Sequence, residues 1–387
     1  MIAATNLASV PLDGYQIGNP ERVLTPALAI YADLVDANVA ATIRILGGDA
    51  DRWRPHIKTA KLSFILRRLL ESGVNNFKCA TTLELFTAAH CGAPDVLIAY
   101  PVQGANAMRV REIAKQFPAT RVSALADSLE GVSLWKKGPV GLFVDVNPGM
   151  NRTGISTALT REILRIVTAI RSEGIEFRGL HSYDGHLRQQ DLTERTAAAH
   201  RIYGELLQLT AALGDAGVEI PEVITAGTPS LPCSVSYEGF RRASFTHRVS
   251  PGTVVYGDAT SISQLPAELG YTPAVLVVAR VVSRPAAGII TCDAGHKAVS
   301  ADSGTPTCSV AGHPEYEPLP PSEEHLPIRI PGGAPAPAIG EYLYLLPRHV
   351  CPTVNNFDEA LIVRNQKVER IERVTARGHE TLLRAAV

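Results

Sequence analysis

Apolar and polar positions alternate regularly over the first two thirds of the chain. From about residue 26, short apolar runs of strand length alternate with segments whose apolar residues recur every three or four positions, the spacing of an amphipathic helix. The expected strands are residues 27–33, 53–58, 76–80, 95–101, 121–127, 140–149, 176–185 and 222–228, with helices such as 36–48 and 62–73 between most of them. About eight such repeats predict an α/β chain with a parallel (β/α)8 TIM-type barrel rather than an open doubly wound sheet.

Past about residue 262 the pattern becomes that of a β-rich domain. Residues 274–295 are rich in Val and Ile, and residues 314–322 form a Pro-rich loop. Residues 340–349 and 359–374 read as strands, the last as a hairpin that turns at Asn365 and Gln366. We therefore expect the barrel over residues 24–262 and the β-rich domain over residues 263–387, with the N-terminal segment 1–23 added to the latter.

Composition narrows the class of protein. The 387 residues are 45% hydrophobic, and 37 Lys and Arg against 38 Asp and Glu give a net charge of -1, so a basic nucleic-acid binder or a polybasic membrane-surface protein is disfavoured. No apolar run is long enough to span a membrane, and the first residues lack the pattern of a signal peptide, so a cytoplasmic location is expected. The six cysteines are scattered without a CxxC pair, which indicates reduced thiols.

Candidate chemistry follows the apolar runs, because reacting groups of a parallel barrel lie at the carboxyl ends of its strands. Lys58 ends the second run; it is either a desolvated, nucleophilic amine or a lysine that reaches solvent. Arg152 lies between Gly149 and Gly154, where a rigid cation could face an anionic oxygen, although a plain strand-to-helix turn fits as well.

Two turns of small residues, 225–230 and 250–258, could cradle a phosphate with their backbone N–H groups or be ordinary turns. The chain has neither GxxxxGK[ST] nor GxGxxG, so nucleotide binding is weakly supported. In an extended segment His349 and Cys351 would share one face and could bind a catalytic metal ion together; a half-buried histidine and a core cysteine are the alternative.

Taken in order, the motifs PHIKT, GMNRTG, YDGH, AGTPS, PGTVVYGD, DAGHKAVSADSG and HVCPTVN resemble those of the fold-type III pyridoxal-phosphate enzymes that act on D-amino acids. This family comprises D-serine dehydratases, D-threonine aldolases and D-3-hydroxyaspartate lyases, and its barrel resembles that of alanine racemase. The resemblance covers nearly the whole chain. It implies a small-molecule D-amino acid substrate and a homodimer, with neither nucleic acid nor membrane as a partner.

The resemblance also implies roles for particular residues. Lys58 matches the lysine that binds pyridoxal 5'-phosphate covalently, and His56 of the same motif is expected to contact the cofactor. Arg152 matches an arginine near the phenolic oxygen, Tyr183 a tyrosine at the cofactor ring, and His186 beside it is a catalytic candidate. The residues expected to hold the phosphate are Gly227, Thr228, Gly252 and Thr253, and those expected to hold the metal are His349 and Cys351.

Other positions match the family less clearly. Ala60 stands where the family motif leads us to expect a histidine, which puts the role of that imidazole in doubt here. Asp293, Lys297 and Asp302 match a family motif but could equally be structural.

Cys351 bears on the reaction, because the dehydratases of the family carry His-x-Cys whereas the aldolases pair the histidine with an aspartate. A thiolate also favours zinc, while carboxylate suits manganese or magnesium. We therefore expect a lyase that removes water from D-3-hydroxy amino acids, such as D-serine, D-threonine or 3-hydroxy-D-aspartate, to give a keto acid and ammonia. The alternatives are an aldolase that releases glycine and an aldehyde, an amino-acid racemase, and a non-catalytic cofactor carrier.

Overall fold

The computed structural model describes residues 7–383 and divides into two compact units. The barrel unit comprises Ile43–Lys58, Leu66–Gly252 and the residues from Gly378 on. The β unit comprises the residues up to Thr42, Thr59–Ile65 and Thr253–Arg377. The main part of the barrel unit, Leu66–Gly252, ends ten residues before the expected boundary at residue 262. No helix within the described residues is both long and apolar enough to cross a membrane.

The barrel unit is built on parallel strands. In sheet order they are β2 (Asn76–Cys79), β3 (Asp95–Ile98), β4 (Arg121–Ala126), β5 (Gly141–Asn147), β7 (Phe177–Ser182), β8 (Glu222–Thr225) and β9 (Thr246–Val249), and the two-residue β6 (Ile155–Ser156) pairs with β5. Strands β2, β3 and β7 are buried along their whole length, which explains why parallel strands of this kind read as continuous apolar runs.

The segment 53–57 closes this sheet into a ring. Trp53 bridges Val249 of β9, and His56 bridges Lys78 of β2, both in parallel. The predicted strand 53–58 therefore takes the eighth position of the barrel through isolated bridges rather than a regular ladder. The predicted (β/α)8 architecture with a β-rich unit after it is confirmed.

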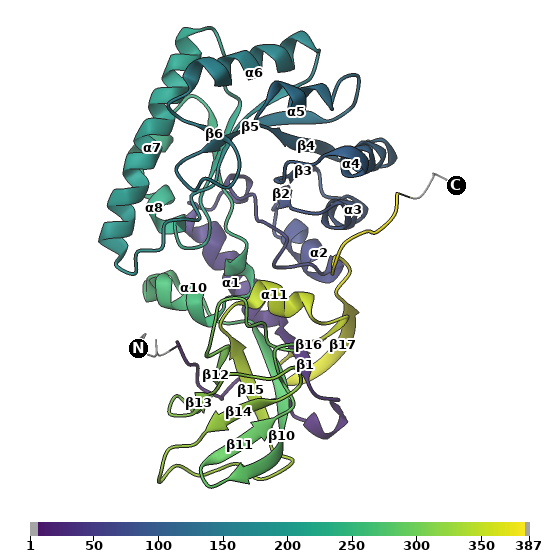
Figure 1. Cartoon of the computed structure of the whole chain (residues 1–387), viewed down its shortest axis with the longest axis vertical. Helices are drawn as coiled ribbons and strands as arrows, with labels where there is room; N and C mark the ends of the chain where they lie inside the picture. Colours follow the sequence, from purple (N-terminus) through teal and green to yellow (C-terminus); the bar gives the residue numbers. More distant parts are fainter. Residues whose placement is uncertain (1–6, 384–387) are drawn as a thin grey trace. The chain divides into compact units, whose positions relative to one another are not determined.

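Helices lie outside the strand ring of the barrel unit (Figure 1). They include α3 (Thr82–His90), α4 (Gly104–Gln116), α5 (Leu129–Ser133), α6 (Thr160–Ser172), α7 (Leu192–Asp215), α8 (Leu231–Val235) and α9 (Glu238–Arg241), while α1 (Ala32–Ile45) and α2 (Ser63–Glu71) run across unit boundaries. Helix α6 illustrates why such segments pack as helices: its buried residues form one apolar stripe at helical spacing, Ile163, Ile166, Val167 and Ile170.

The β unit contains a nine-stranded sheet. The strands are β1 (Ala27–Tyr31), β10 (Val275–Ala286), β11 (Ile289–Cys292), β12 (Cys308–Val310), β13 (Glu317–Pro318), β14 (Leu326–Arg329), β15 (Tyr342–Pro347), β16 (Glu359–Arg364) and β17 (Lys367–Arg373). Two short helices, α10 (Ala259–Gln264) and α11 (Val350–Asn355), accompany the sheet.

Strand β1 corrects the sequence-based assignment, which made residues 27–33 the first barrel strand. It pairs antiparallel with β10 and parallel with β16, so both of its edges are used inside the β unit. An apolar run shows that a strand is buried but not which sheet buries it. The predicted hairpin of β16 and β17 is confirmed, and Asn365 and Gln366 both have positive φ, as a tight hairpin turn requires.

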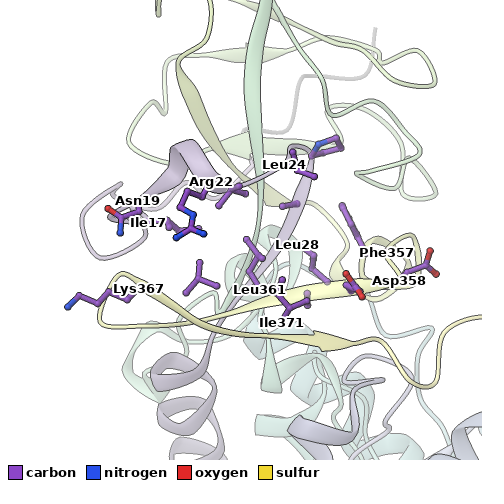
Figure 2. Close-up of a pocket in the computed structure, with 16 residues that line it drawn as sticks. Ile17, Asn19, Arg22, Leu24, Leu28, Phe357, Asp358, Leu361, Lys367 and Ile371 are labelled. Carbon is purple, nitrogen blue, oxygen red and sulfur yellow. The ribbon is translucent and has the colours of Figure 1, made fainter.

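The β unit also has a largely apolar cavity of about 750 Å³ between the segment 17–28 and the β16–β17 hairpin. Figure 2 shows Leu28, Leu361 and Ile371 among its lining side chains, with Arg22 and Lys367 also on its border. Neither histidine nor cysteine is among its lining residues, so it lacks the groups that the candidate chemistry needs.

Candidate active site

A cavity of about 360 Å³ lies at the carboxyl ends of the barrel strands. Its lining residues come from the closing segment and from the ends of β2, β3, β5 and β7: His56, Lys58, Lys78, Ala80, Ala99, Tyr100, Pro101, Arg152, Thr153, His181 and Tyr183. Four residues predicted from three separate motifs, His56, Lys58, Arg152 and Tyr183, are therefore brought together. This is the end of a parallel barrel at which side chains from different strands converge on one ligand.

The predicted side chains are arranged around an accessible amine. Lys58 is exposed, and its backbone N–H donates to His56 Nδ1 at 3.3 Å. The guanidinium of Arg152 lies 4.8 Å from the ring centroid of Tyr183, a cation–π contact that positions both groups. The amine can thus react with a ligand while the arginine offers it positive charge.

Two predicted glycines lie in crowded surroundings, and one of them is required by close approach. A Cβ on Gly252 would lie 2.3 Å from the carbonyl oxygen of His56, which leaves no room for a side chain. A Cβ on Gly227 would lie 3.2 Å from the ring of Tyr183. In the same turn Thr228 is buried, and its Oγ1 has no hydrogen-bond partner. A buried hydroxyl without a partner is costly unless a ligand completes it, which fits an anionic group at this turn.

Sequence reasoning missed Asp184, which fixes that turn. Its buried carboxylate accepts hydrogen bonds from the Gly227 N–H at 3.2 Å, the Ser230 hydroxyl at 2.7 Å and the Tyr203 hydroxyl at 2.6 Å. Asp184 stands next to Tyr183 in the sequence. It therefore ties the loop after β7 to the turn after β8.

Sequence reasoning also missed a series of hydrogen-bonded polar side chains on the inner face of the barrel. Lys78 on β2 lies 2.5 Å from the Ser250 hydroxyl and 3.3 Å from Nε2 of His181, and Nδ1 of His181 lies 2.7 Å from Asp145 on β5. The signal was present, because each of these three charged or titratable residues interrupts an otherwise apolar strand (NFKC, LFVDV, GLHS). A polar residue in a buried strand needs a partner, but the sequence does not say which one.

Among the predicted barrel residues, Gly227, Thr228 and Gly252 do not line the cavity. His186 does not line it either. Its Nδ1 is buried without a hydrogen-bond partner, and a Cβ on Gly149 would lie 3.6 Å from its Nε2. Thr253 begins a short 3-10 turn, Thr253–Val255, in the β unit. Their predicted roles remain predictions.

The predicted metal pair lies in the β unit. His349 precedes α11 and Cys351 is in its first turn, so the extended geometry assumed for this segment is wrong. The reason is that Pro352 is tolerated in the first turn of a helix, where its missing N–H is not needed. The two side chains still interact. Burial lowers the pKa of His349, but hydrogen bonds to Cys351 and Asp302 outweigh this effect and raise the pKa to about 9.

The surroundings of this pair suit a cation. Asp302 lies 2.7 Å from Nδ1 of His349, which leaves Nε2 as the nitrogen for a metal ion, the usual arrangement of a carboxylate behind a metal-binding histidine. Cys351 Sγ lies 2.9 Å from the Thr59 hydroxyl and 3.6 Å from that of Thr253. Within the described residues no cluster of three or more His, Cys, Asp or Glu side chains could hold a metal ion.

Two of the less certain motif residues have structural roles. Asp293 accepts hydrogen bonds from the Arg280 N–H at 2.7 Å and from the Thr25 hydroxyl at 2.5 Å. Lys297 forms an exposed ion pair with Glu323 at 2.7 Å. Ala60, which stands in place of the expected histidine, is buried, and its carbonyl accepts from Tyr256.

The chain matches two family models: the N-terminal domain of alanine racemase over residues 30–260 and a putative serine dehydratase domain over residues 274–363. It is 29% identical to D-threonine aldolase of Arthrobacter sp over 94% of this chain and 95% of that protein. It is 24% identical to D-threo-3-hydroxyaspartate dehydratase of Delftia sp. over 86% of this chain and 92% of that protein. The solved structure of D-threonine aldolase from Filomicrobium marinum superposes with a TM-score of 0.84 at 28% identity, covering 92% of this chain and 96% of that one.

The barrel, its cavity and these matches define a pyridoxal-phosphate enzyme of the alanine racemase-like fold. With the second family model and its relatives, the chain belongs to the fold-type III family of D-amino acid lyases, and it is a pyridoxal-phosphate-dependent lyase. The residues present fit that cofactor, because an accessible lysine and an arginine line one cavity, and the turn that approaches its Tyr183 carries an unpartnered buried hydroxyl.

Proposed function

We propose that this protein is a metal-dependent dehydratase of D-3-hydroxy amino acids, which removes water across Cα and Cβ to give a keto acid and ammonia. The observation that carries the proposal is the His349–Cys351 pair, whose histidine is oriented by Asp302. Thiolate and imidazole ligands together favour zinc over manganese or magnesium.

The Delftia dehydratase supports this choice. Solved structures of D-threo-3-hydroxyaspartate dehydratase include a variant with a histidine replaced by alanine and a variant with the cysteine two residues later replaced by alanine, the latter in a metal-free form. His349 and Cys351 have the same spacing. We infer that they hold the metal here.

The roles of the chain's own residues follow. When bound, pyridoxal phosphate supplies an electron sink for Cα, and a metal ion supplies Lewis acidity for a β-hydroxyl. Lys58 would hold the cofactor, and its amine is placed to act as the base that takes the proton at Cα. Arg152 offers charge to an anionic oxygen, and the turn at Gly227 and Thr228 binds the phosphate. His349 and Cys351 would hold the metal ion through an imidazole nitrogen and a thiolate sulfur.

Retro-aldol cleavage is the second candidate, and the 29% identity to D-threonine aldolase favours it. The two reactions differ in the bond that breaks. A dehydratase breaks Cβ–O and releases ammonia, whereas an aldolase breaks Cα–Cβ and releases glycine and an aldehyde.

Product analysis tests the proposal. Purified protein with pyridoxal phosphate and zinc, and in parallel with manganese, is incubated with D-serine, D-threonine and D-3-hydroxyaspartate, and ammonia and glycine are both measured. We expect ammonia in stoichiometric amount with keto acid, and loss of activity in Cys351→Ala. Glycine as the main product would contradict a dehydratase and identify an aldolase. Activity that survives a chelator and yields only the enantiomer would identify a racemase.

We also propose a homodimer, as the family resemblance implies. Light scattering at assay concentration tests it. A mass of about 83 kDa is expected from the 41.4 kDa chain, and a monomer would contradict it.

A further inference from the structure

Lys78 is a second lysine of the cavity that contains Lys58. It is the third residue of β2, is 2% exposed, and lines the cavity together with Lys58, His181 and Tyr183. A buried lysine is rare because removing an ammonium group from water is costly, and it is retained where it is paired or used. Lys78 therefore calls for a reason beyond packing.

The contacts of Lys78 fix its direction. Thr153 and His181 both donate to the Asp145 carboxylate, at 2.7 Å each, and these hydrogen bonds hold the pKa of Asp145 below its ordinary value although burial alone would raise it. The proton of His181 is then on Nδ1, and Nε2 is free to accept from Lys78. Ser250 accepts a second N–H of Lys78 while its own hydroxyl donates to the Ala226 carbonyl at 2.9 Å.

One direction of the amine remains for the cavity. An ammonium group has three N–H donors, and two of them are used on Ser250 and His181. Lys78 Nζ also lies 5.3 Å from the ring centroid of Tyr183, which lines the same cavity. No carboxylate within the described residues pairs directly with Lys78, because Asp145 is reached only through His181.

The charge of this amine responds to its neighbours. Burial, and then the positive charges of Lys58 and Arg152, lower the pKa of Lys78 to about 7, against the opposing effect of Asp145 and Asp184. The other titratable group that contacts it, His181, has its own pKa lowered by burial and by Lys78. An anion that enters the cavity would favour the protonated amine.

We propose that Lys78 is a further cofactor-contacting residue of this enzyme: it makes no covalent bond, and its nitrogen takes up a proton from solvent when an anionic pyridoxal phosphate enters the cavity. The amine R–NH2 becomes R–NH3⁺ and donates its third N–H to the cofactor, with Ser250 and His181 holding the other two. The inference rests on the proposed binding of pyridoxal phosphate in the barrel.

The test measures proton uptake on binding of 4'-deoxypyridoxine 5'-phosphate, which lacks the aldehyde and cannot bond to Lys58. Calorimetry in two buffers of different ionisation enthalpy, at pH 7.5 to 8, gives the protons taken up. We expect wild type to take up about half a proton or more in excess of Lys78→Met, and Lys78→Met to bind the probe about tenfold more weakly. The matched control is Lys136→Met, which removes a surface lysine paired with Glu173 at 2.6 Å and should behave as wild type.

The outcomes separate the alternatives. Equal proton uptake and affinity in wild type and Lys78→Met overturn the inference, as does a loss of thermal stability with unchanged uptake, which would make Lys78 purely structural. If Lys78→Met does not fold, Asp145→Asn is tested in its place. This variant keeps Lys78 but removes a negative charge that favours protonation of its amine, so proton uptake should decrease above pH 7, where the amine of the apo protein is largely neutral. An unchanged pH profile of proton uptake overturns the inference. Wild type that binds neither this probe nor pyridoxal phosphate instead refutes the proposed function.

Discussion

At the amino ends of the barrel strands, buried charges face opposite charges directly. Arg54, which is fully buried, donates to Asp95 at 2.6 Å and to Glu222 at 2.9 Å, and Arg178 and Arg248 complete the cluster. At the carboxyl ends, Lys58, Lys78 and Arg152 line one cavity, and among residues 7–383 none of them forms an ion pair with a carboxylate. The barrel thus pairs its charged side chains at the amino ends of the strands and leaves the basic side chains at the carboxyl ends available to a ligand.

The difference shows what each end is for. A fully paired cluster has little to gain from a ligand and serves the fold, whereas a cavity lined by two lysines and an arginine attracts an anion. The buried hydroxyl of Thr228, which has no hydrogen-bond partner, is a further group that an anionic ligand would satisfy. Substitutions at the two ends should therefore affect different measurements, stability at one and cofactor binding at the other.

The largest effect is expected for Lys58→Ala. Because its amine holds the cofactor and acts as the base at Cα, lyase activity should fall by about 10⁴-fold or more, with little change in melting temperature since the side chain is exposed. Steady-state rates and a thermal melt of the apo protein check both halves. Retained activity would exclude Lys58 from the chemistry.

Asp95→Asn should lower stability and leave cofactor binding unchanged. Removing one partner from the buried cluster leaves Arg54 and Arg178 short of negative charge, so the free energy of unfolding should fall by about 3–5 kcal/mol, measured by urea denaturation. The folded enzyme should bind pyridoxal phosphate as wild type does. As a control, breaking the exposed Lys136–Glu173 pair should cost about 1 kcal/mol or less. Similar losses for both variants would argue against a structural role for the cluster.

The pH dependence of stability should differ between wild type and Lys78→Met. The pKa of Lys78 is about 7 in the folded protein and near its ordinary value of 10.5 when unfolded, so between these values the unfolded chain binds more protons. Wild-type stability should therefore rise as pH increases from about 7 to about 10, relative to Lys78→Met. Denaturation curves of the apo proteins across this range test it, and parallel profiles would show that burial does not suppress the charge of Lys78.

The smallest effect is expected for Thr228→Val. The unpartnered hydroxyl is lost, so the apo protein should be no less stable, while affinity for pyridoxal phosphate should fall about tenfold through one lost hydrogen bond to an anion. Thr225→Val is the matched control, because the Thr225 hydroxyl lies 2.8 Å from both Ser234 and His247. It should lower stability and leave affinity nearly unchanged; the reverse pattern would place the phosphate elsewhere.

The sequence predicted the barrel and the group of Lys58, Arg152 and Tyr183, because local patterns and short motifs report strands and the turns that follow them. It could not assign β1 to the β unit, since pairing with β10 and β16 is a property of distant segments. The extended form assumed for His349 and Cys351 was wrong because a proline near a helix start resembles one in a strand. The chain from Lys78 to Asp145 crosses three strands, and only the fold shows it.

The most direct test is to treat the enzyme with pyridoxal phosphate and borohydride and to map the modified peptide by mass spectrometry. The reduced cofactor should be found on Lys58 alone, while Lys78 in the same cavity remains unmodified. Modification of Lys78, or of neither lysine, would contradict the account of the carboxyl end of the barrel.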